Sequence, residues 1–126
     1  MKKVYGGEVI SRGRKLSLSR VVRAGDMIYV TGQLPLVDGV AVTDGTIEEQ
    51  TRVVCERLKE NLALAGCELA DVVKAMVWLQ DPQDFEGFNS AFGEYFPEDP
   101  PARSAVVSKL LQDVRVEVEV VAYRPE

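Results

Sequence analysis

The chain has 126 residues, 46% of them hydrophobic, and a formal net charge of −5. This length suffices for one hydrophobic core, so we expect a single domain over residues 1–126. The fifteen basic residues are scattered, so no nucleic-acid partner is expected. No apolar run approaches the ~20 residues of a membrane-spanning helix, and the first residues lack an apolar signal segment. A cytoplasmic protein without membrane contact is predicted.

The chain contains no histidine, which excludes Ser-His and Cys-His nucleophile pairs and removes the commonest ligand of several transition metals. Catalysis would have to use Asp, Glu, Arg, Tyr, Thr, backbone groups or water, and no metal site is expected. Cys55 and Cys67 are far apart and lie in or near helical sequence. They form no disulfide framework or metal-binding pair, so buried free thiols are predicted.

Two β-branched segments predict a tight hairpin early in the chain. Residues 20–23 and 27–31 are joined by Ala24-Gly25-Asp26, and Gly32 is expected to end the second strand. Residues 34–44 are rich in turn-forming residues and predict a loop with room for a short strand.

The middle of the chain predicts two helices around a strand. The capping box at Thr46 begins the first helix, which runs at helical spacing to Gly66. Residues 71–79 are apolar on both faces, as expected for a strand covered by helices on one side and by something else, such as another subunit, on the other. Asp81 and Pro82 predict the start of the second helix. Its aromatic stripe is interpreted as core: Phe85, Phe88, Phe92 and Phe96.

Prolines end that helix before two final strands, at 102–107 and 114–123. The order ββ-α-β-α-ββ predicts an α+β or α/β sandwich, with two helices on one face of a mixed sheet. Alternation in the last strand turns five residues to one side: Val114, Val116, Val118, Val120 and Ala122. The opposite side is half charged and half apolar: Arg115, Glu117, Glu119, Val121 and Tyr123. Such a face suggests contact with neighbouring subunits, so a homo-oligomer is expected.

Arg103 is the most informative single residue. It follows Pro100 and Pro101 and precedes the strand at 113–120. A guanidinium held in one orientation is a natural receptor for a small carboxylate, which it can bind with two hydrogen bonds. The alternative is a solvated arginine or a structural ion pair.

Several motifs together resemble a known family. They are the segment 22–33, Ala65-Gly66-Cys67, Asp71-Val72-Val73-Lys74 with Asp81, Phe88-Asn89, Pro101-Ala102-Arg103-Ser104 and Val116-Glu117-Val118-Glu119. On these residues the chain resembles the YjgF/RidA family of reactive-intermediate deaminases, whose members are also named L-PSP endoribonucleases or translation initiation inhibitors. The resemblance covers most of the chain from Arg20 onward.

The resemblance implies a chorismate-mutase-like fold that assembles as a homotrimer with clefts between subunits. It also implies hydrolysis of 2-imino or enamine acids, of the 2-aminoacrylate or 2-aminocrotonate type, to 2-keto acids and ammonia. No cofactor is implied. By the same resemblance, Arg103 would bind the substrate carboxylate and Glu117 would orient or activate water. Thr31 and Gly32 would line the pocket, and Ala105 would contribute its main chain.

Two of these assignments have alternatives. Asn89 matches a polar position beside the pocket, but it can also be a helix residue bonded to backbone. Glu117 can form an ion pair with Arg115 of a neighbour or with Arg20 on an adjacent strand. Glu119, on the same side of its strand, is the reserve candidate for the water.

The chain departs from the family before the first hairpin. Where many members have Gly-Pro-Tyr-Ser-Gln, this chain has residues 16–20, with Leu18 in place of the tyrosine that closes over the ligand. The lost hydroxyl removes one hydrogen bond, of order 1 kcal/mol. The departure implies a different substrate or a reduced rate, unless Tyr5 or Tyr123 supplies the ring.

Three functions follow, in decreasing order of weight. The first is an imine or enamine deaminase that depends on Arg103 and Glu117. The second is a non-catalytic module that binds small carboxylates in the same cleft, which the altered segment before the hairpin favours. The third is a ribonuclease, which would need a basic RNA track and an acid/base pair that this acidic, histidine-free chain does not show.

Overall fold

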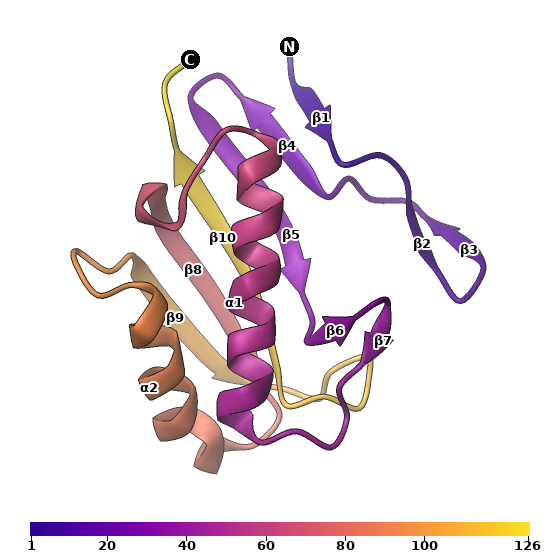
Figure 1. The fold of residues 1–126 in the computed structure, drawn as a ribbon, viewed down its shortest axis with the longest axis vertical. Helices are drawn as coiled ribbons and strands as arrows, with labels where there is room; N and C mark the ends of the chain where they lie inside the picture. The colour runs from indigo at the N-terminus through magenta and orange to yellow at the C-terminus, as the bar shows by residue number, and fades with distance from the viewer.

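The computed structural model describes all 126 residues. A six-stranded sheet lies at its centre, in the order β1-β4-β5-β10-β8-β9. The strands are β1 (Lys3–Tyr5), β4 (Val21–Ala24), β5 (Met27–Gln33), β8 (Val72–Leu79), β9 (Ala102–Val107) and β10 (Val116–Tyr123). Neighbouring strands are antiparallel except for β8 and β9, which are parallel. The helices α1 (Ile47–Leu64) and α2 (Phe85–Tyr95) both lie on one face of the sheet (Figure 1).

The predicted α+β architecture and element order are confirmed, and the structure adds short strands. Strand β1 pairs with β4, and two small hairpins are formed by β2 (Val9–Ser11) with β3 (Arg14–Leu16) and by β6 (Leu36–Val37) with β7 (Val40–Ala41). The β2–β3 hairpin extends away from the sheet (Figure 1). Its turn residues Arg12 and Gly13 both have positive φ, 53° and 76°, as a two-residue type I′ turn requires. Strand β5 also runs one residue past Gly32, where it was expected to end.

Helix α1 begins and ends where the sequence predicts. The Glu49 amide donates to Thr46 Oγ1 at 3.1 Å, and the Thr46 amide donates to Glu49 Oε1 at 3.3 Å. Its last turn has no basic residue. The guanidinium of Arg23, from β4, donates instead to the Ala65 carbonyl at 3.3 Å. This cation stabilises the C-terminal end of the helix dipole.

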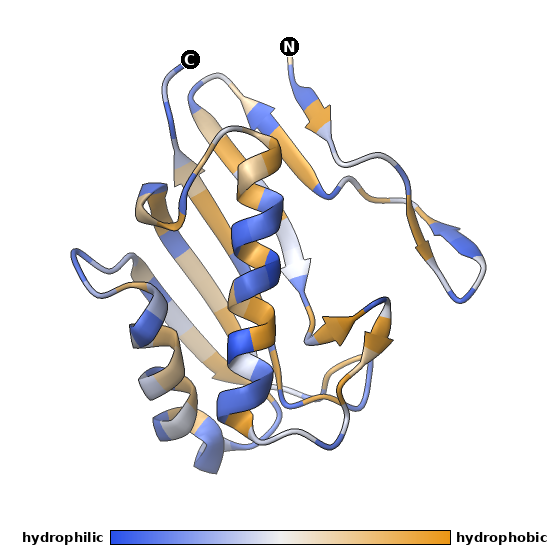
Figure 2. Cartoon of the chain, viewed as in Figure 1, coloured by the Kyte–Doolittle hydropathy of each residue, from blue (hydrophilic) through white to orange (hydrophobic).

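The core lies between the helices and the sheet, and the strands that cross it are strongly apolar (Figure 2). The predicted alternation in the last strand is confirmed, since its five inward residues are all buried. Phe88 and Phe92 on α2, and Phe96 directly after it, are buried. The ring centroids of Phe88 and Phe92 lie 5.2 Å apart, and those of Phe92 and Phe96 lie 4.5 Å apart. Phe85 was expected in this core, and that prediction is wrong. It begins α2 at the outer edge of the sheet, and 42% of it is exposed.

The two cysteines are buried and free, as predicted. Burial raises the pKa of Cys55 to about 12, so its thiol stays protonated and inert at neutral pH. Neither helix has the length and apolar character needed to cross a bilayer.

The two faces of the sheet differ in what lies against them. We call the side that packs against α1 and α2 the covered face and the other side the open face. Residues of the open face remain partly or fully exposed: Tyr29, Thr31, Met76, Trp78, Glu117, Glu119, Val121 and Tyr123. Apart from Lys74 on the open face, strand β8 is apolar toward both faces, and neither helix covers its second side.

Candidate active site

Arg103 lies on the covered face, at the outer edge of the sheet. It pairs in register with Ala75, which is fully buried, so its side chain points toward α2. Its Nη2 donates to Asn89 Oδ1 at 3.0 Å. The guanidinium carbon lies 5.6, 5.3 and 5.2 Å from three ring centroids of the same helix: Phe85, Phe88 and Phe92. These contacts hold the cation in one orientation through hydrogen bonding and cation–π attraction.

No carboxylate oxygen lies within 4.0 Å of the Arg103 guanidinium. Burial lowers the pKa of Arg103, because the charged form loses water without gaining a counter-ion. Beside it lies a hollow of about 410 Å³, lined by Asn89, Phe92, Gly93, Phe96, Pro100, Pro101 and Arg103. An immobilised, unpaired and partly desolvated cation at such a hollow has the properties that binding of a small anion requires.

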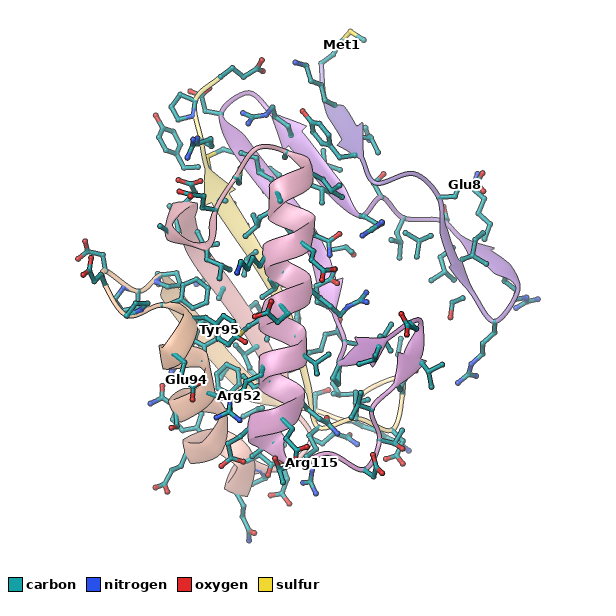
Figure 3. The ribbon with its side chains drawn as sticks, in the orientation of Figure 1. Met1, Glu8, Arg52, Glu94, Tyr95 and Arg115 are labelled. Carbon is teal, nitrogen blue, oxygen red and sulfur yellow. The ribbon has the colours of Figure 1, made fainter.

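Helix α2, which orients Arg103, is fixed at both ends. Figure 3 shows Arg52 of α1 reaching Glu94 of α2, where two hydrogen bonds of 3.1 Å and 2.9 Å form. At the start of the helix, Arg115 donates to Asp84 at 3.2 Å. Both contacts tie α2 to the rest of the domain, so the position of Asn89 is set by the fold. The side chain of Asn89 bonds to Arg103, which favours its placement beside the pocket over the alternative of a backbone contact.

Glu117 lies on the open face of β10, in register with Trp78 of β8. On its other side, the pairing of β10 with β5 is irregular: Val118 opposes Gln33, while Val120 opposes Val30. This β-bulge inserts one extra residue into β5, at Thr31 and Gly32. The bulge brings Gly32 beneath the Glu117 carboxylate, so closely that a Cβ there would collide with Glu117 Oε2 and lie 3.2 Å from its Cδ.

The Glu117 carboxyl has no hydrogen bond or ion pair within the chain. Arg115 bonds to Asp84 and to the Gly45 carbonyl, and Arg20 bonds to Asn61 and to the Gly6 carbonyl, so neither pairs with Glu117 within the subunit. Burial, with a smaller contribution from the charge of Glu119, raises the pKa of Glu117. The raised pKa makes this carboxylate a stronger proton acceptor than an ordinary glutamate.

The structure divides the predicted site residues into two groups. Arg103, Asn89 and Ala105 lie on β9 and α2, whereas Glu117, Thr31 and Gly32 lie around the bulge on the open face. Within one subunit the groups are separated by two strand spacings, about 10 Å, and by about 10 Å along the strands. The sheet itself lies between them. A small molecule therefore cannot contact Arg103 and Glu117 of the same subunit at once.

Leu18 belongs to neither group. It lies between β3 and β4, and 42% of it is exposed. Tyr5 packs against the core from β1. Tyr123 is on the open face, six residues along β10 from Glu117, which is about 20 Å. Within the subunit, neither tyrosine lies where it could close over Glu117.

Two features of the site were missed by reading the sequence. The three rings that flank Arg103 have a sequence signal, the stripe along α2, but it was interpreted only as core. The bulge has no signal beyond Gly32 itself, since the number of residues between paired positions depends on the partner strand. Across the chain, no three Asp, Glu or Cys side chains gather where a metal ion could bind.

Comparison with known proteins places the chain among related sequences. A sequence profile of the family described as Endoribonuclease L-PSP matches residues 14–124. A RutC family protein from Pyrococcus horikoshii is 42% identical over 108 residues, which cover 84% of this chain and 86% of that protein. The structure of RidA from an Antarctic Psychrobacter species is 35% identical, with a TM-score of 0.79, and the match covers 85% of this chain and 88% of that one. Escherichia coli TdcF with bound serine is 26% identical, with a TM-score of 0.84 and coverage of 97% and 98%.

Proposed function

Because the chain belongs to the Endoribonuclease L-PSP family, to which the YjgF/RidA proteins belong, we propose that it is a deaminase of small 2-imino or enamine acids. The substrates are of the 2-aminoacrylate or 2-aminocrotonate type, and the products are a 2-keto acid and ammonia. The observation that carries this proposal is the Arg103 guanidinium, which is oriented by Asn89 and aromatic rings and has no carboxylate partner. It is suited to the carboxylate that all these substrates share.

The site is proposed to form between subunits of a homotrimer. Arg103 and Glu117 face opposite sides of one sheet, so a substrate that touches both must lie between two copies of the chain. On the open face, Trp78 lies in register with Glu117 and is partly exposed, as is Val121 further along β10. This face is suited to contact with a second copy. In this arrangement one subunit supplies Arg103, Asn89 and the main chain at Ala105. The next supplies Glu117, Thr31 and Gly32.

The proposed reaction needs no nucleophilic side chain. Arg103 holds the carboxylate of the protonated imine, whose carbon is already electrophilic. An enamine first takes a proton from solvent on its terminal carbon, which gives that imine. Glu117 accepts a proton as water attacks the imine carbon, and then returns it to the nitrogen of the tetrahedral adduct. The C–N bond breaks as Glu117 takes the proton of the adduct's hydroxyl, so ammonia leaves and the carbonyl of the keto acid forms. Glu117 then passes this proton to the departing ammonia or to solvent and is ready for the next cycle. Positioning and proton transfer are the two contributions required of the protein, and the raised pKa of Glu117 supports its role.

The serine named in the TdcF structure supports the substrate class. Serine is a small amino acid with a free carboxylate, the group that Arg103 is proposed to bind. The two buried free thiols are suited to a reducing compartment, so the cytoplasm is the proposed location.

A second candidate is a module that binds small carboxylates without turnover. It is favoured by Leu18, an exposed apolar side chain where many family members have the tyrosine that closes over the ligand. The ribonuclease activity in the family's name is a weaker candidate, because the chain has a net charge of −5 and RNA-binding grooves are positively charged.

A coupled assay tests the proposal. A dehydratase generates 2-aminoacrylate or 2-aminocrotonate, and imine decay is followed with wild type, Arg103→Ala and Arg14→Ala. Arg14 is the control because it is exposed on strand β3 and contacts neither α2 nor the site. We expect wild type and Arg14→Ala to accelerate decay. Arg103→Ala should be at least 100-fold slower, because it removes a charged partner worth about 3 kcal/mol. Ligand binding without acceleration by wild type would favour the binding module.

A further inference from the structure

A second pair of arginines without carboxylate partners lies on the covered face, near the other edge of the sheet. Arg20 immediately precedes β4, and Arg57 lies in the middle of α1, which packs across β4 and β5. Both side chains are partly exposed. The proposed deaminase site uses neither residue, and strands β10 and β8 separate this region from Arg103 on β9.

Two buried amides hold the guanidinium groups in place. Gln33 Oε1 accepts from Arg57 Nε at 3.1 Å and from Asn61 Nδ2 at 3.2 Å. Asn61 Oδ1 accepts from Arg20 Nε at 3.1 Å. Gln33 is 3% exposed and Asn61 is 2% exposed. Gln33 Nε2 donates to the Thr31 carbonyl at 2.9 Å, and Asn61 Nδ2 also donates to the Arg57 carbonyl at 2.8 Å. These buried amides orient both arginines by their Nε atoms.

The outer donors of both arginines are left without partners in the chain. Each guanidinium has five N–H donors. Arg57 uses only Nε, and Arg20 uses Nε and one bond from Nη1 to the Gly6 carbonyl, at 3.2 Å. No carboxylate oxygen lies within 4.0 Å of either group.

The charges of the pair are also uncompensated. Burial lowers the pKa of Arg57, and the nearby charge of Arg20 lowers it further, while Glu60 acts weakly in the opposite direction. Glu60 is three residues along α1 from Arg57 but forms no ion pair with it. Two like charges held together by neutral amides repel each other, in a protein whose net charge is negative. A bound anion would relieve that repulsion.

We propose that Arg20 and Arg57 form a binding site for a small oxyanion of the phosphate class. Two planar guanidinium groups on different elements offer more donors than the two oxygens of a carboxylate can accept, whereas the oxygens of a phosphate can be shared between both arginines. Gln33 and Asn61 position the two arginines and do not contact the anion.

The test is a titration with inorganic phosphate in the Arg103→Ala background, so that the deaminase site cannot supply the signal. Ionic strength is held constant with chloride, and binding is followed by calorimetry and by backbone NMR shifts at Arg20, Gln33 and Arg57. We expect saturable binding that Arg57→Gln and Arg20→Gln each weaken at least tenfold. Arg14→Gln, which removes the same charge from the exposed strand β3, should leave the affinity unchanged. Absence of saturable binding, or equal affinity in Arg57→Gln and Arg14→Gln, would overturn the proposal.

Stability separates a binding role from a structural one. In phosphate-free buffer, Arg57→Gln should melt at the same temperature as the parent or above it, because a repulsive charge is removed. Phosphate should raise the melting temperature of the parent and leave that of Arg57→Gln unchanged. A large loss of stability in Arg57→Gln, with Arg20→Gln retaining phosphate affinity, would contradict the assignment.

Two further ligands define the chemistry. Acetate should bind at least tenfold more weakly than phosphate, and equal affinities would contradict the phosphate class. Glycerol phosphate tests the source of the group. Tighter binding than inorganic phosphate would identify a phosphorylated metabolite as the ligand, and equal binding would identify free phosphate; both results support the site.

Discussion

The two faces of the central sheet have the same strands but different tasks. On the covered face, alternate residues of β10 are buried beneath α1 and belong to the hydrophobic core. On the open face, the intervening residues combine apolar side chains with Glu117 and Glu119, and within the subunit nothing covers them. Side chains of a strand alternate between its two faces. Neighbouring residues of β10 can therefore serve different purposes, one in the core and the next on a surface that is open in the subunit.

Val120 and Val121 test this division most directly, because they are adjacent and point to opposite faces. Val120→Ala should lower the free energy of unfolding of the subunit by about 2–3 kcal/mol, since it leaves a cavity in the core. Val121→Ala should cost less than about 0.5 kcal/mol in the isolated subunit. Urea denaturation at low protein concentration measures both. Equal costs would show that the open face is as well packed as the core.

Gly32→Ala tests the contact beneath Glu117. The new methyl group would displace the carboxylate from the bulge, so we expect kcat/KM to fall by about 30-fold, or roughly 2 kcal/mol. The control is the same substitution in a Glu117→Ala background, where no carboxylate remains to be displaced. An equal loss in both backgrounds would show that Gly32 acts independently of Glu117.

Val121→Lys tests whether the open face is an interface between copies. Lys74 stands opposite Val121 on β8, so the new charge would face a like charge. It should weaken self-association by at least tenfold, about 1.4 kcal/mol, without unfolding the subunit. Sedimentation velocity over a range of concentrations measures the change. Val40→Lys is the control, because Val40 is exposed on the small β6–β7 hairpin, away from the central sheet. If both variants assemble like wild type, subunits do not meet through Val121.

The smallest expected effect concerns the pH dependence of stability. Because the pKa of Glu117 is raised in the folded protein, its ionised form opposes folding. The penalty is absent below the ordinary pKa of 4.5 and develops as pH rises through the raised value. Glu117→Gln should therefore stabilise the subunit at pH 7 by a few tenths of a kcal/mol, because solvent screens this half-exposed group. The gain should vanish below about pH 4 in thermal melts, and a gain that persists in acid would have another cause.

Local signals in the sequence predicted most of the fold. The capping box at Thr46 and the alternation in β10 each depend on residues close together in the chain, and both are confirmed. Asp81 and Pro82 were expected to start the second helix. They start a short 3-10 helix, Pro82–Asp84, and α2 follows it at Phe85. Strand β1 was missed because Lys3–Tyr5 is too short and too polar to show a pattern, and it is a strand only because β4 pairs with it. Phe85 matched the helical stripe, yet its position at the first turn of α2 leaves it outside the core.

The composition of the candidate site was more predictable than its geometry. Residue type proposed Arg103 as a carboxylate receptor, and the family resemblance proposed roles for Asn89 and Glu117. No local pattern shows which face of β9 carries Arg103. Nearly every residue of that strand is exposed. Its sequence therefore has no alternation of apolar and polar residues that would show which side chains face the core. The cluster around Gln33 was invisible for a similar reason. It joins residues from β5, α1 and the segment before β4, which only the tertiary fold brings together.

The contact between Gly32 and Glu117 also constrains how this protein can diverge. The carboxylate occupies the space that any side chain at position 32 would need, so the two positions cannot vary independently. A homologue that gains a side chain at position 32 must shorten residue 117 or move its strand. Across an alignment of relatives, this predicts that a residue larger than glycine at position 32 rarely coexists with glutamate at position 117. The pair can therefore sort sequences that keep this carboxylate in place from those that have adopted other chemistry.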